Sequence, residues 1–173
     1  MCIRDSLWRA MNPLSPGLNR VEADELSYGL HILIRTELEI ALLEGGLAVS
    51  DLPNEWNRRY GELLGVTPEN DAEGCLQDVH WSEGLFGYFP SYLLGHLISA
   101  QISEAMIEAI GSPEDHVARG DMAPLLAWLR EQVHPLGRSV NAEQLVEQVT
   151  GRPLDAGSFL TYLEGKLAAL SNT

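Results

Sequence analysis

The chain has 173 residues, of which 45% are hydrophobic and 21% are charged, a composition typical of a soluble globular protein with one core. Its formal net charge of −14 argues against nucleic acid and anionic membranes as partners, because both bind clustered Lys and Arg. Cys2 and Cys75 provide neither a disulfide framework nor a zinc motif, and no apolar run reaches transmembrane length, so we predict a reducing, cytoplasmic setting.

Residues 1–6 lack the apolar core of a signal peptide. They resemble a translated sequencing-adapter remnant, so we expect a non-native leader there and a single helical domain over residues 7–173. The first long helix of that domain is predicted from about residue 23 to residue 44, where a pair of glycines ends it. Ser50 or Asp51 is expected to cap a second helix that runs to about Leu64.

The next segment, residues 66–90, is predicted to be irregular because prolines and glycines interrupt it. A segment of this length without regular structure inside a compact domain is usually functional. No period-two strand pattern extends beyond a few residues, so the predicted fold class is all-α. Further helices are predicted over residues 91–110, from an Asp121 cap to about residue 134, from a capping box of Asn141 and Gln144 to Gly151, and from an Asp155 cap to Leu170.

One face of the first long helix is polar, whereas its other faces are almost entirely apolar. A helix that is apolar nearly all round is expected to be buried, and buried charges need partners. The stripe therefore faces a wet cavity or a network of partners, or it forms an internal ladder that only staples helices; its spacing is compatible with each. The stripe consists of Asp24, Tyr28, His31, Arg35 and Glu39.

The irregular segment contains the strongest candidates for chemistry. His80 lies between Asp78 and Trp81, and an imidazole oriented by a carboxylate can donate a hydrogen bond to a developing oxyanion. Tyr88 follows a glycine and can play the same role with its phenol. The alternatives are that His80 is a surface histidine and that Tyr88 is an aromatic side chain that only packs. We adopt the packing interpretation for Phe89. We interpret His96 as a satisfied interior histidine, and His116 and His134 as structural or exposed.

Several motifs together resemble the carboxypeptidase Taq family of zinc metallocarboxypeptidases. The run from Arg20 to Arg35 is similar to the family pattern R-V-E-A-D-E-x-[ST]-Y-x-x-H-I-x-x-R. The family motif G-x-x-Q-D-x-H-W follows at Gly74–Trp81, and F-G-Y-F-P-[ST]-Y follows at Phe86–Tyr92. The similarity extends over essentially Leu7 to Leu170, and the combination of motifs is highly specific.

The resemblance implies a mostly helical, homodimeric enzyme with a deep cleft, which uses a zinc-activated water to release C-terminal amino acids from peptides. In such enzymes zinc, or another divalent metal, is held by an H-E-x-x-H motif and a downstream Glu, and that motif is absent from these 173 residues. This chain thus resembles the C-terminal third of the enzyme, which forms one wall of the cleft. Without the missing N-terminal part, we expect it to bind no metal and to be inactive.

The same resemblance assigns roles to individual residues. Arg35 would bind the terminal carboxylate of the substrate, since a guanidinium fork suits a planar anion. His80 and Tyr88 would stabilise the tetrahedral intermediate, with Tyr92 as a weaker candidate. The side chains expected to support them are Asp24, His31, Gln77 and Asp78.

Two other functions are compatible with the sequence. The chain could be a stand-alone, non-catalytic module that binds peptide C-termini, or a purely structural dimerisation domain. An H-E-x-x-H motif encoded in frame upstream of Leu7 would favour the enzyme, whereas a true promoter and start codon before Met1 would favour the binding module.

Overall fold

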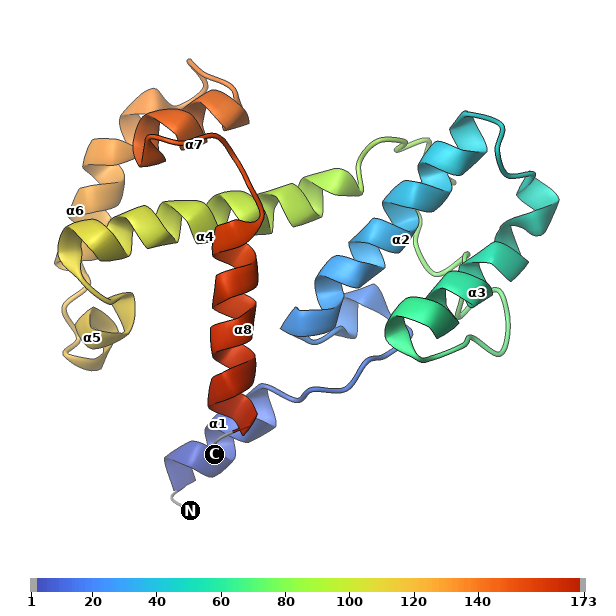
Figure 1. Ribbon diagram of the computed structural model, residues 1–173, viewed down its shortest axis with the longest axis horizontal. Coiled ribbons are helices and arrows are strands. Elements are labelled where there is room, and N and C mark those ends of the chain that lie inside the picture. The colour runs from blue at the N-terminus through green and yellow to red at the C-terminus, as the bar shows by residue number, and fades with distance from the viewer. Residues whose placement is uncertain (1–2, 172–173) are drawn as a thin grey trace. The chain divides into compact units, whose positions relative to one another are not determined.

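The computed structural model describes residues 3–171 of the chain, and the predictions that concern Met1 and Cys2 lie outside them. The described residues form helices without any strand, which confirms the predicted all-α class (Figure 1). The α-helices are α1 (Ile3–Met11), α2 (Glu25–Leu43), α3 (Leu52–Leu64), α4 (Pro90–Ile110), α5 (Pro113–Ala118), α6 (Ala123–Gln132), α7 (Ala142–Thr150) and α8 (Gly157–Ser171), and three short 3-10 helices span Arg20–Glu22, Val49–Asp51 and His134–Leu136.

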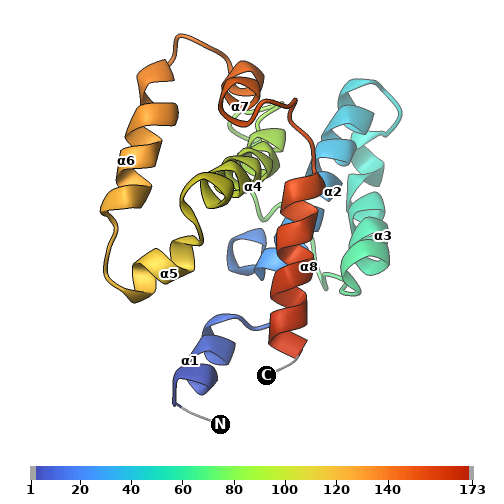
Figure 2. The same ribbon diagram turned by 60° about the vertical axis from the view of Figure 1, so that its left-hand side comes forward.

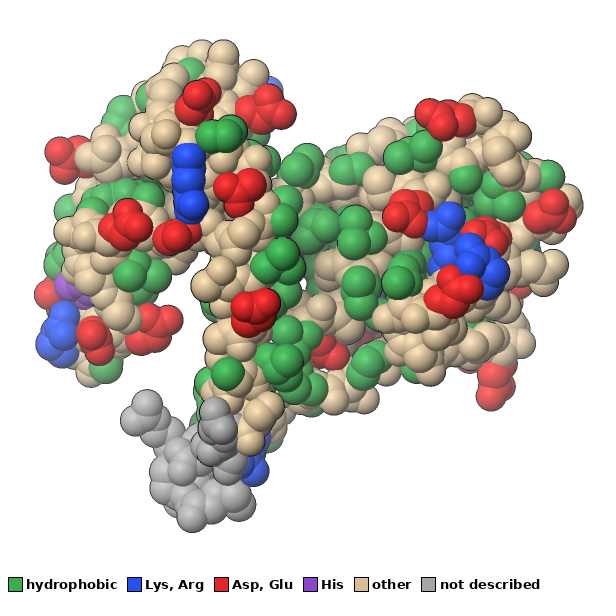
Figure 3. Space-filling view, viewed as in Figure 1, with side chains coloured by type: hydrophobic (Ala, Val, Ile, Leu, Met, Phe, Trp, Pro, Cys, Tyr) green, Lys and Arg blue, Asp and Glu red, His purple; other side chains and the backbone are tan. Residues whose placement is uncertain are grey.

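The chain divides into two compact units, one formed by residues up to Leu93 together with those from Ala169 onward, the other by Leu94–Ala168. The boundary between them falls inside α4. The domain predicted over residues 7–173 draws on both units, and α1 runs across the predicted end of the leader at Ser6. Acidic side chains are scattered over the face shown in Figure 3 rather than gathered in one patch.

Helices α2 and α3 form the core of the first unit. Helix α2 begins where the side chain of Asp24 accepts a 2.8 Å hydrogen bond from the backbone N–H of Ser27. It ends at Leu43 with Glu44 as its C-cap, and Gly45 then turns the chain with a φ of +78°. The chain then reverses, and α3 lies beside α2 (Figures 1 and 2). Their shared core consists of Ile34, Leu38, Leu52, Trp56, Tyr60, Leu64 and Cys75.

The segment between Leu64 and Pro90 contains turns and bends but no helix or strand, as predicted. It is nevertheless tied to the core, because Cys75 is buried in the cluster and Trp81 packs against it. Burial raises the pKa of the Cys75 thiol. The backbone of this segment turns at Gly84 and Gly87, whose φ values of +73° and +76° are unfavourable for residues with a Cβ. The segment thus returns to α2 before α4 begins (Figure 1).

The second unit is tied together by Gln101 on α4. Its side chain is fully buried, donates to the Pro153 carbonyl at 2.9 Å and accepts from the Asp155 N–H at 3.2 Å. His96 lies 5.8 Å, ring to ring, from Phe159 on α8, which agrees with a structural role. No helix within residues 3–171 is both long and apolar enough to cross a membrane.

Three local expectations were wrong or incomplete. Helices α1 and α5 were not predicted. Ser112 and Pro113, which follow the end of α4, form the cap and first turn of α5, where Ser112 accepts from the Glu114 N–H at 3.2 Å. The predicted Asp121 cap is wrong, because Met122 occupies the cap of α6 and makes no side-chain cap bond. By contrast, the capping box of Asn141 and Gln144 at α7 is confirmed.

Candidate active site

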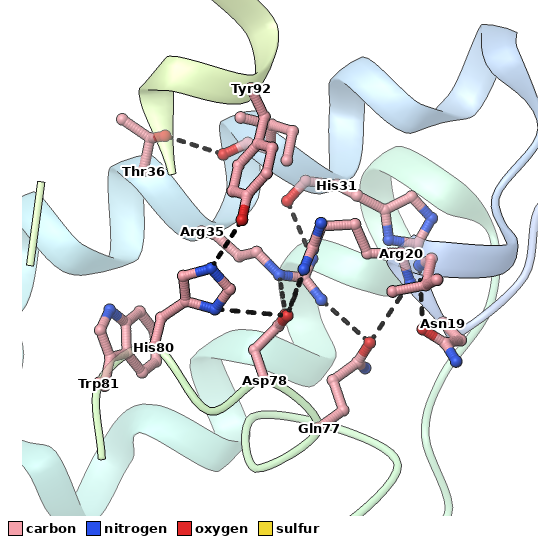
Figure 4. Close-up of polar contacts among 12 residues, drawn as sticks. Asn19, Arg20, His31, Arg35, Thr36, Gln77, Asp78, His80, Trp81 and Tyr92 are labelled. Carbon is pink, nitrogen blue, oxygen red and sulfur yellow. Dashed lines mark hydrogen bonds and ion pairs between the residues drawn. The ribbon is translucent and has the colours of Figure 1, made fainter. Parts of the chain in front are cut away.

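The centre of the site is Arg35, which α2 places at its meeting point with α3 and the irregular segment (Figure 4). Its side chain is 0% exposed. Its Nε donates to Asp78 Oδ2 at 2.5 Å, and its Nη2 donates to Gln77 Oε1 at 3.0 Å. Its Nη1 donates to the Tyr60 hydroxyl and to the His31 carbonyl, each at 2.9 Å. Arg35 therefore organises three separate segments of the chain from inside the protein.

A second arginine binds the other oxygen of the same carboxylate. Arg20 donates from Nη2 to Asp78 Oδ1 at 2.7 Å and from Nε to the same oxygen at 3.3 Å, and its guanidinium lies 4.9 Å from the centre of the Tyr92 ring. Its side chain is 10% exposed. Two arginines and one aspartate leave a formal excess of one positive charge at this spot, within a chain whose net charge is −14.

The ionisation of Asp78 follows from this arrangement. Burial alone would raise the pKa of its carboxyl group, but the hydrogen bonds and charges of Arg20 and Arg35 outweigh burial and hold that pKa below its usual value. Asp78 is therefore an anion at neutral pH. It links the two arginines to each other and to His80, whose Nδ1 lies 3.7 Å from Asp78 Oδ1 (Figure 4).

Behind Arg35, His31 and Tyr60 form a buried polar pair. His31 Nδ1 lies 3.1 Å from the Tyr60 hydroxyl, and both side chains are fully buried. Burial, reinforced by the charges of Arg35 and Arg20, lowers the pKa of His31 to about 4, so the ring is neutral at pH 7. Burial also raises the pKa of the Tyr60 phenol. The pair therefore presents neutral hydrogen-bonding groups to the arginine.

This lowered pKa predicts a pH dependence of stability. Below its ordinary pKa of 6.5, His31 takes up a proton in the unfolded chain but not in the folded chain until about pH 4. The free energy of unfolding should therefore fall as the pH decreases through that window, by on the order of 3 kcal/mol at its lower end. Urea unfolding between pH 7 and about 5, above the range in which most carboxylates titrate, measures the slope.

His31→Phe should remove most of that slope, because phenylalanine fills a similar volume and does not titrate. The control is His134→Gln, at an exposed position, which should keep the wild-type slope. A His31→Phe variant whose stability depends on pH as strongly as wild type would contradict the assignment.

The irregular segment and the start of α4 carry the second half of the site. His80 is 7% exposed; its Nε2 lies 3.0 Å from the Tyr92 hydroxyl, and its ring packs 4.4 Å from that of Phe89. The ring of Tyr88 lies 5.7 Å from that of His80, and Tyr88 is 48% exposed. An imidazole and two phenols thus meet beside the two arginines.

The polar stripe of α2 proves to face a network of partners. Arg35 pairs with Asp78 of the irregular segment, and Glu39 accepts from the Trp81 indole N–H at 2.8 Å and from the backbone N–H of Gly87. Through these contacts, Arg35 and Glu39 of the stripe position the irregular segment. Asp24, which we expected to support the site, caps α2 and accepts from the Ser15 N–H at 3.1 Å.

The structure brings most of the predicted site residues together, namely His31, Arg35, Gln77, Asp78, His80, Tyr88 and Tyr92. Sequence reasoning assigned no role to Arg20, Tyr60 or Glu39. The sequence carries a signal for two of them, because Arg20 is the first residue of the family motif that runs to Arg35 and Glu39 lies in the polar stripe. The sequence carries no signal for a role of Tyr60 in the site, since a tyrosine one turn after Trp56 resembles ordinary core packing.

Within residues 3–171, no three His, Cys, Asp or Glu side chains lie close enough together to share a metal ion. The residues described by the structure therefore do not by themselves bring together the three or more protein ligands that a zinc site uses.

Comparison with known proteins places these features in a family. The model of the carboxypeptidase Taq (M32) metallopeptidase family matches residues 2–167. Thermostable carboxypeptidase 1 of Thermus thermophilus is 48% identical over 161 residues, which cover 93% of this chain and 32% of that protein. Carboxypeptidase 1 of Bacillus subtilis is 43% identical over 166 residues, which cover 96% of this chain and 33% of that protein.

Solved structures agree with the sequence comparison. The M32 carboxypeptidase from Deinococcus radiodurans superposes with a TM-score of 0.93 at 42% identity, over 98% of this chain and 34% of that one. A Pyrococcus furiosus carboxypeptidase gives a TM-score of 0.91 at 35% identity, over 95% of this chain and 33% of that one. The chain thus spans about a third of the length of the relatives that it matches. It belongs to the carboxypeptidase Taq (M32) metallopeptidase family.

Proposed function

We propose that this chain forms one wall of the active site of a metallocarboxypeptidase that releases C-terminal amino acids from peptides. The observation that supports this most directly is the pair of arginines on Asp78 beside the His80–Tyr92 pair. The metal, zinc or another divalent ion, would be held by residues of the parent enzyme outside this chain. The isolated chain would therefore be inactive. From the same family resemblance, we propose that the parent enzyme acts as a homodimer.

The excess positive charge suits a substrate that ends in a free carboxylate. The resemblance assigns that contact to Arg35, but in the structure Arg35 has no exposed surface and its N–H groups donate to four acceptors. The side chain of Arg20, by contrast, is 10% exposed, and its guanidinium donates to Asp78 alone among the acceptors of the site. We therefore assign the direct contact to Arg20, and to Arg35 the role of holding Asp78 and adding positive potential.

The tautomer of His80 decides whether Tyr88 or Tyr92 has a hydroxyl proton free to donate to an oxyanion. The carboxylate of Asp78 faces Nδ1, and therefore favours the tautomer that carries its proton there. Nε2 is then an acceptor, and it receives the hydrogen bond of the Tyr92 hydroxyl at 3.0 Å. Because that interaction occupies the Tyr92 proton, the more exposed Tyr88 is the better candidate to donate to a developing oxyanion.

The proposed function is tested on the full-length parent enzyme with matched peptides. Peptides with a free C-terminus should be cleaved and their C-terminal amides should not. Arg20→Lys keeps the charge but loses the fork of donors, so catalytic efficiency on free C-termini should fall by about tenfold or more. Arg58→Lys, at an exposed ion pair of α3, is the control and should leave efficiency unchanged.

Equal cleavage of free and amidated peptides would contradict a carboxypeptidase. Retention of efficiency by Arg20→Lys, with loss of it in Arg35→Lys, would return the carboxylate contact to Arg35. Binding of peptide C-termini without any cleavage would instead support the non-catalytic module.

A further inference from the structure

A single carboxylate holds both ends of the loop that separates His80 from Tyr88. The Trp81 indole N–H donates to Glu39 Oε2 at 2.8 Å, and the backbone N–H of Gly87 donates to Glu39 Oε1. Trp81 directly follows His80, and Gly87 directly precedes Tyr88. One side chain of α2 thus fixes the residues adjacent to both candidate groups of the site.

Burial of a carboxylate in this place costs free energy, which indicates that both of its oxygens are needed as hydrogen-bond acceptors. Glu39 is 4% exposed, and no Lys or Arg in the described part of the chain forms an ion pair with it. Burial of an ionised group without a counter-charge is unfavourable unless hydrogen bonds compensate. A glutamine of the same shape would avoid the buried charge but would turn an NH₂ group toward one of the two donors. Only a carboxylate accepts both hydrogen bonds.

Aromatic packing by itself does not explain how this loop is held. It does restrain Trp81, whose ring lies 6.4 Å from that of Trp56 and 5.9 Å from that of Phe89. At the other end of the loop, Gly87 has no side chain and its neighbour Phe86 is exposed, so ring packing begins only at Tyr88. The hydrogen bond to Glu39 therefore holds Gly87 at a point of the loop that ring packing does not reach.

We propose that Glu39 is a positioning residue of the active site, which fixes His80 and Tyr88 relative to each other through Trp81 and Gly87. This inference rests on the proposed function, in which Tyr88 donates to the developing oxyanion beside the His80–Tyr92 pair. Donors that act in the transition state are sensitive to small displacements. Loosening the loop should therefore lower kcat while the binding of the substrate carboxylate at Arg20 stays intact.

The experiment uses the full-length parent enzyme and four variants. They are Glu39→Gln, Trp81→Phe, the double variant and the control Glu37→Gln, which removes an exposed charge from the same helix. Hydrogen exchange detected by mass spectrometry reads the mobility of residues 82–88 independently of activity. Steady-state kinetics on a free C-terminal peptide separates kcat from KM.

Glu39→Gln should raise exchange of the loop by about tenfold or more and lower kcat by about tenfold, with KM changed by less than about twofold. Trp81→Phe keeps the ring and loses the N–H, so it should reproduce part of both effects, and the double variant should show less than the sum. Glu37→Gln should behave as wild type.

Unchanged hydrogen exchange of the loop in Glu39→Gln would show that Glu39 does not clamp the loop, that is, does not hold its two ends. Faster exchange with unchanged kcat would show that Glu39 does not position the catalytic groups. Effects of the two substitutions that simply add would also overturn the clamp, because Glu39 and Trp81 would then act independently. If wild-type enzyme releases no amino acid from peptides, the proposed function fails, and hydrogen exchange still decides whether Glu39 clamps the loop. If Glu39→Gln does not fold, Trp81→Phe provides the same readouts.

Discussion

Asp78→Asn should lower the free energy of unfolding by about 3–5 kcal/mol, the typical cost of leaving a buried charge without its partner. In the wild type, the Asp78 carboxylate receives hydrogen bonds from both Arg20 and Arg35, and Arg35 is fully buried. The neutral amide would leave two guanidinium groups with no counter-charge at this point. Its NH₂ group would also face one of them.

Urea unfolding at pH 7 of wild type and variant measures this difference, provided that the m-value is unchanged. The control is Glu62→Gln, because Glu62 pairs with Arg58 on the exposed face of α3 and such surface ion pairs contribute little. A loss in Asp78→Asn as small as that in the control would show that the two arginines find other partners, and that Asp78 does not hold the site together.

Tyr88→Phe should lower kcat of the parent enzyme by about 100-fold with little change in KM, because an oxyanion donor acts mainly in the transition state. The phenol of Tyr88 is half-exposed beside His80, whereas the Tyr92 hydroxyl is engaged by His80 Nε2. Tyr92→Phe should therefore have a smaller effect on kcat, which arises through the orientation of His80.

Both variants keep the aromatic ring, so the ring contacts between Tyr88, Tyr92 and His80 should survive and folding should be unaffected. Steady-state kinetics on one free C-terminal peptide gives the comparison. A large loss in Tyr92→Phe with none in Tyr88→Phe would assign the donor to Tyr92. Full activity in both variants would show that the aromatic cluster only packs, and that His80 acts without a phenol.

Much of the fold was predictable because its signals are local. Helix α2 lies within two residues of its predicted bounds, since Asp24 caps its start and the Gly45 turn ends it. The capping box of α7 is equally local, because both of its partners lie within one helical turn. Helix α5 was not predicted, because the same Ser-Pro pair that ends one helix starts the next. Local signals of this kind indicate a helix terminus without indicating its direction.

The sequence by itself determined the helical class, the polar stripe of α2, the irregular segment and the motifs that identify the family. Only the tertiary structure decided which charges meet and which stay exposed. Arg20 and Arg35 have the same side chain, yet packing of α3 and the irregular segment buries the second completely and leaves the first partly exposed. Partners such as Asp78 lie more than forty residues along the chain from Arg35. Burial and pairing over that separation arise from packing between elements, which periodicity and spacing do not specify.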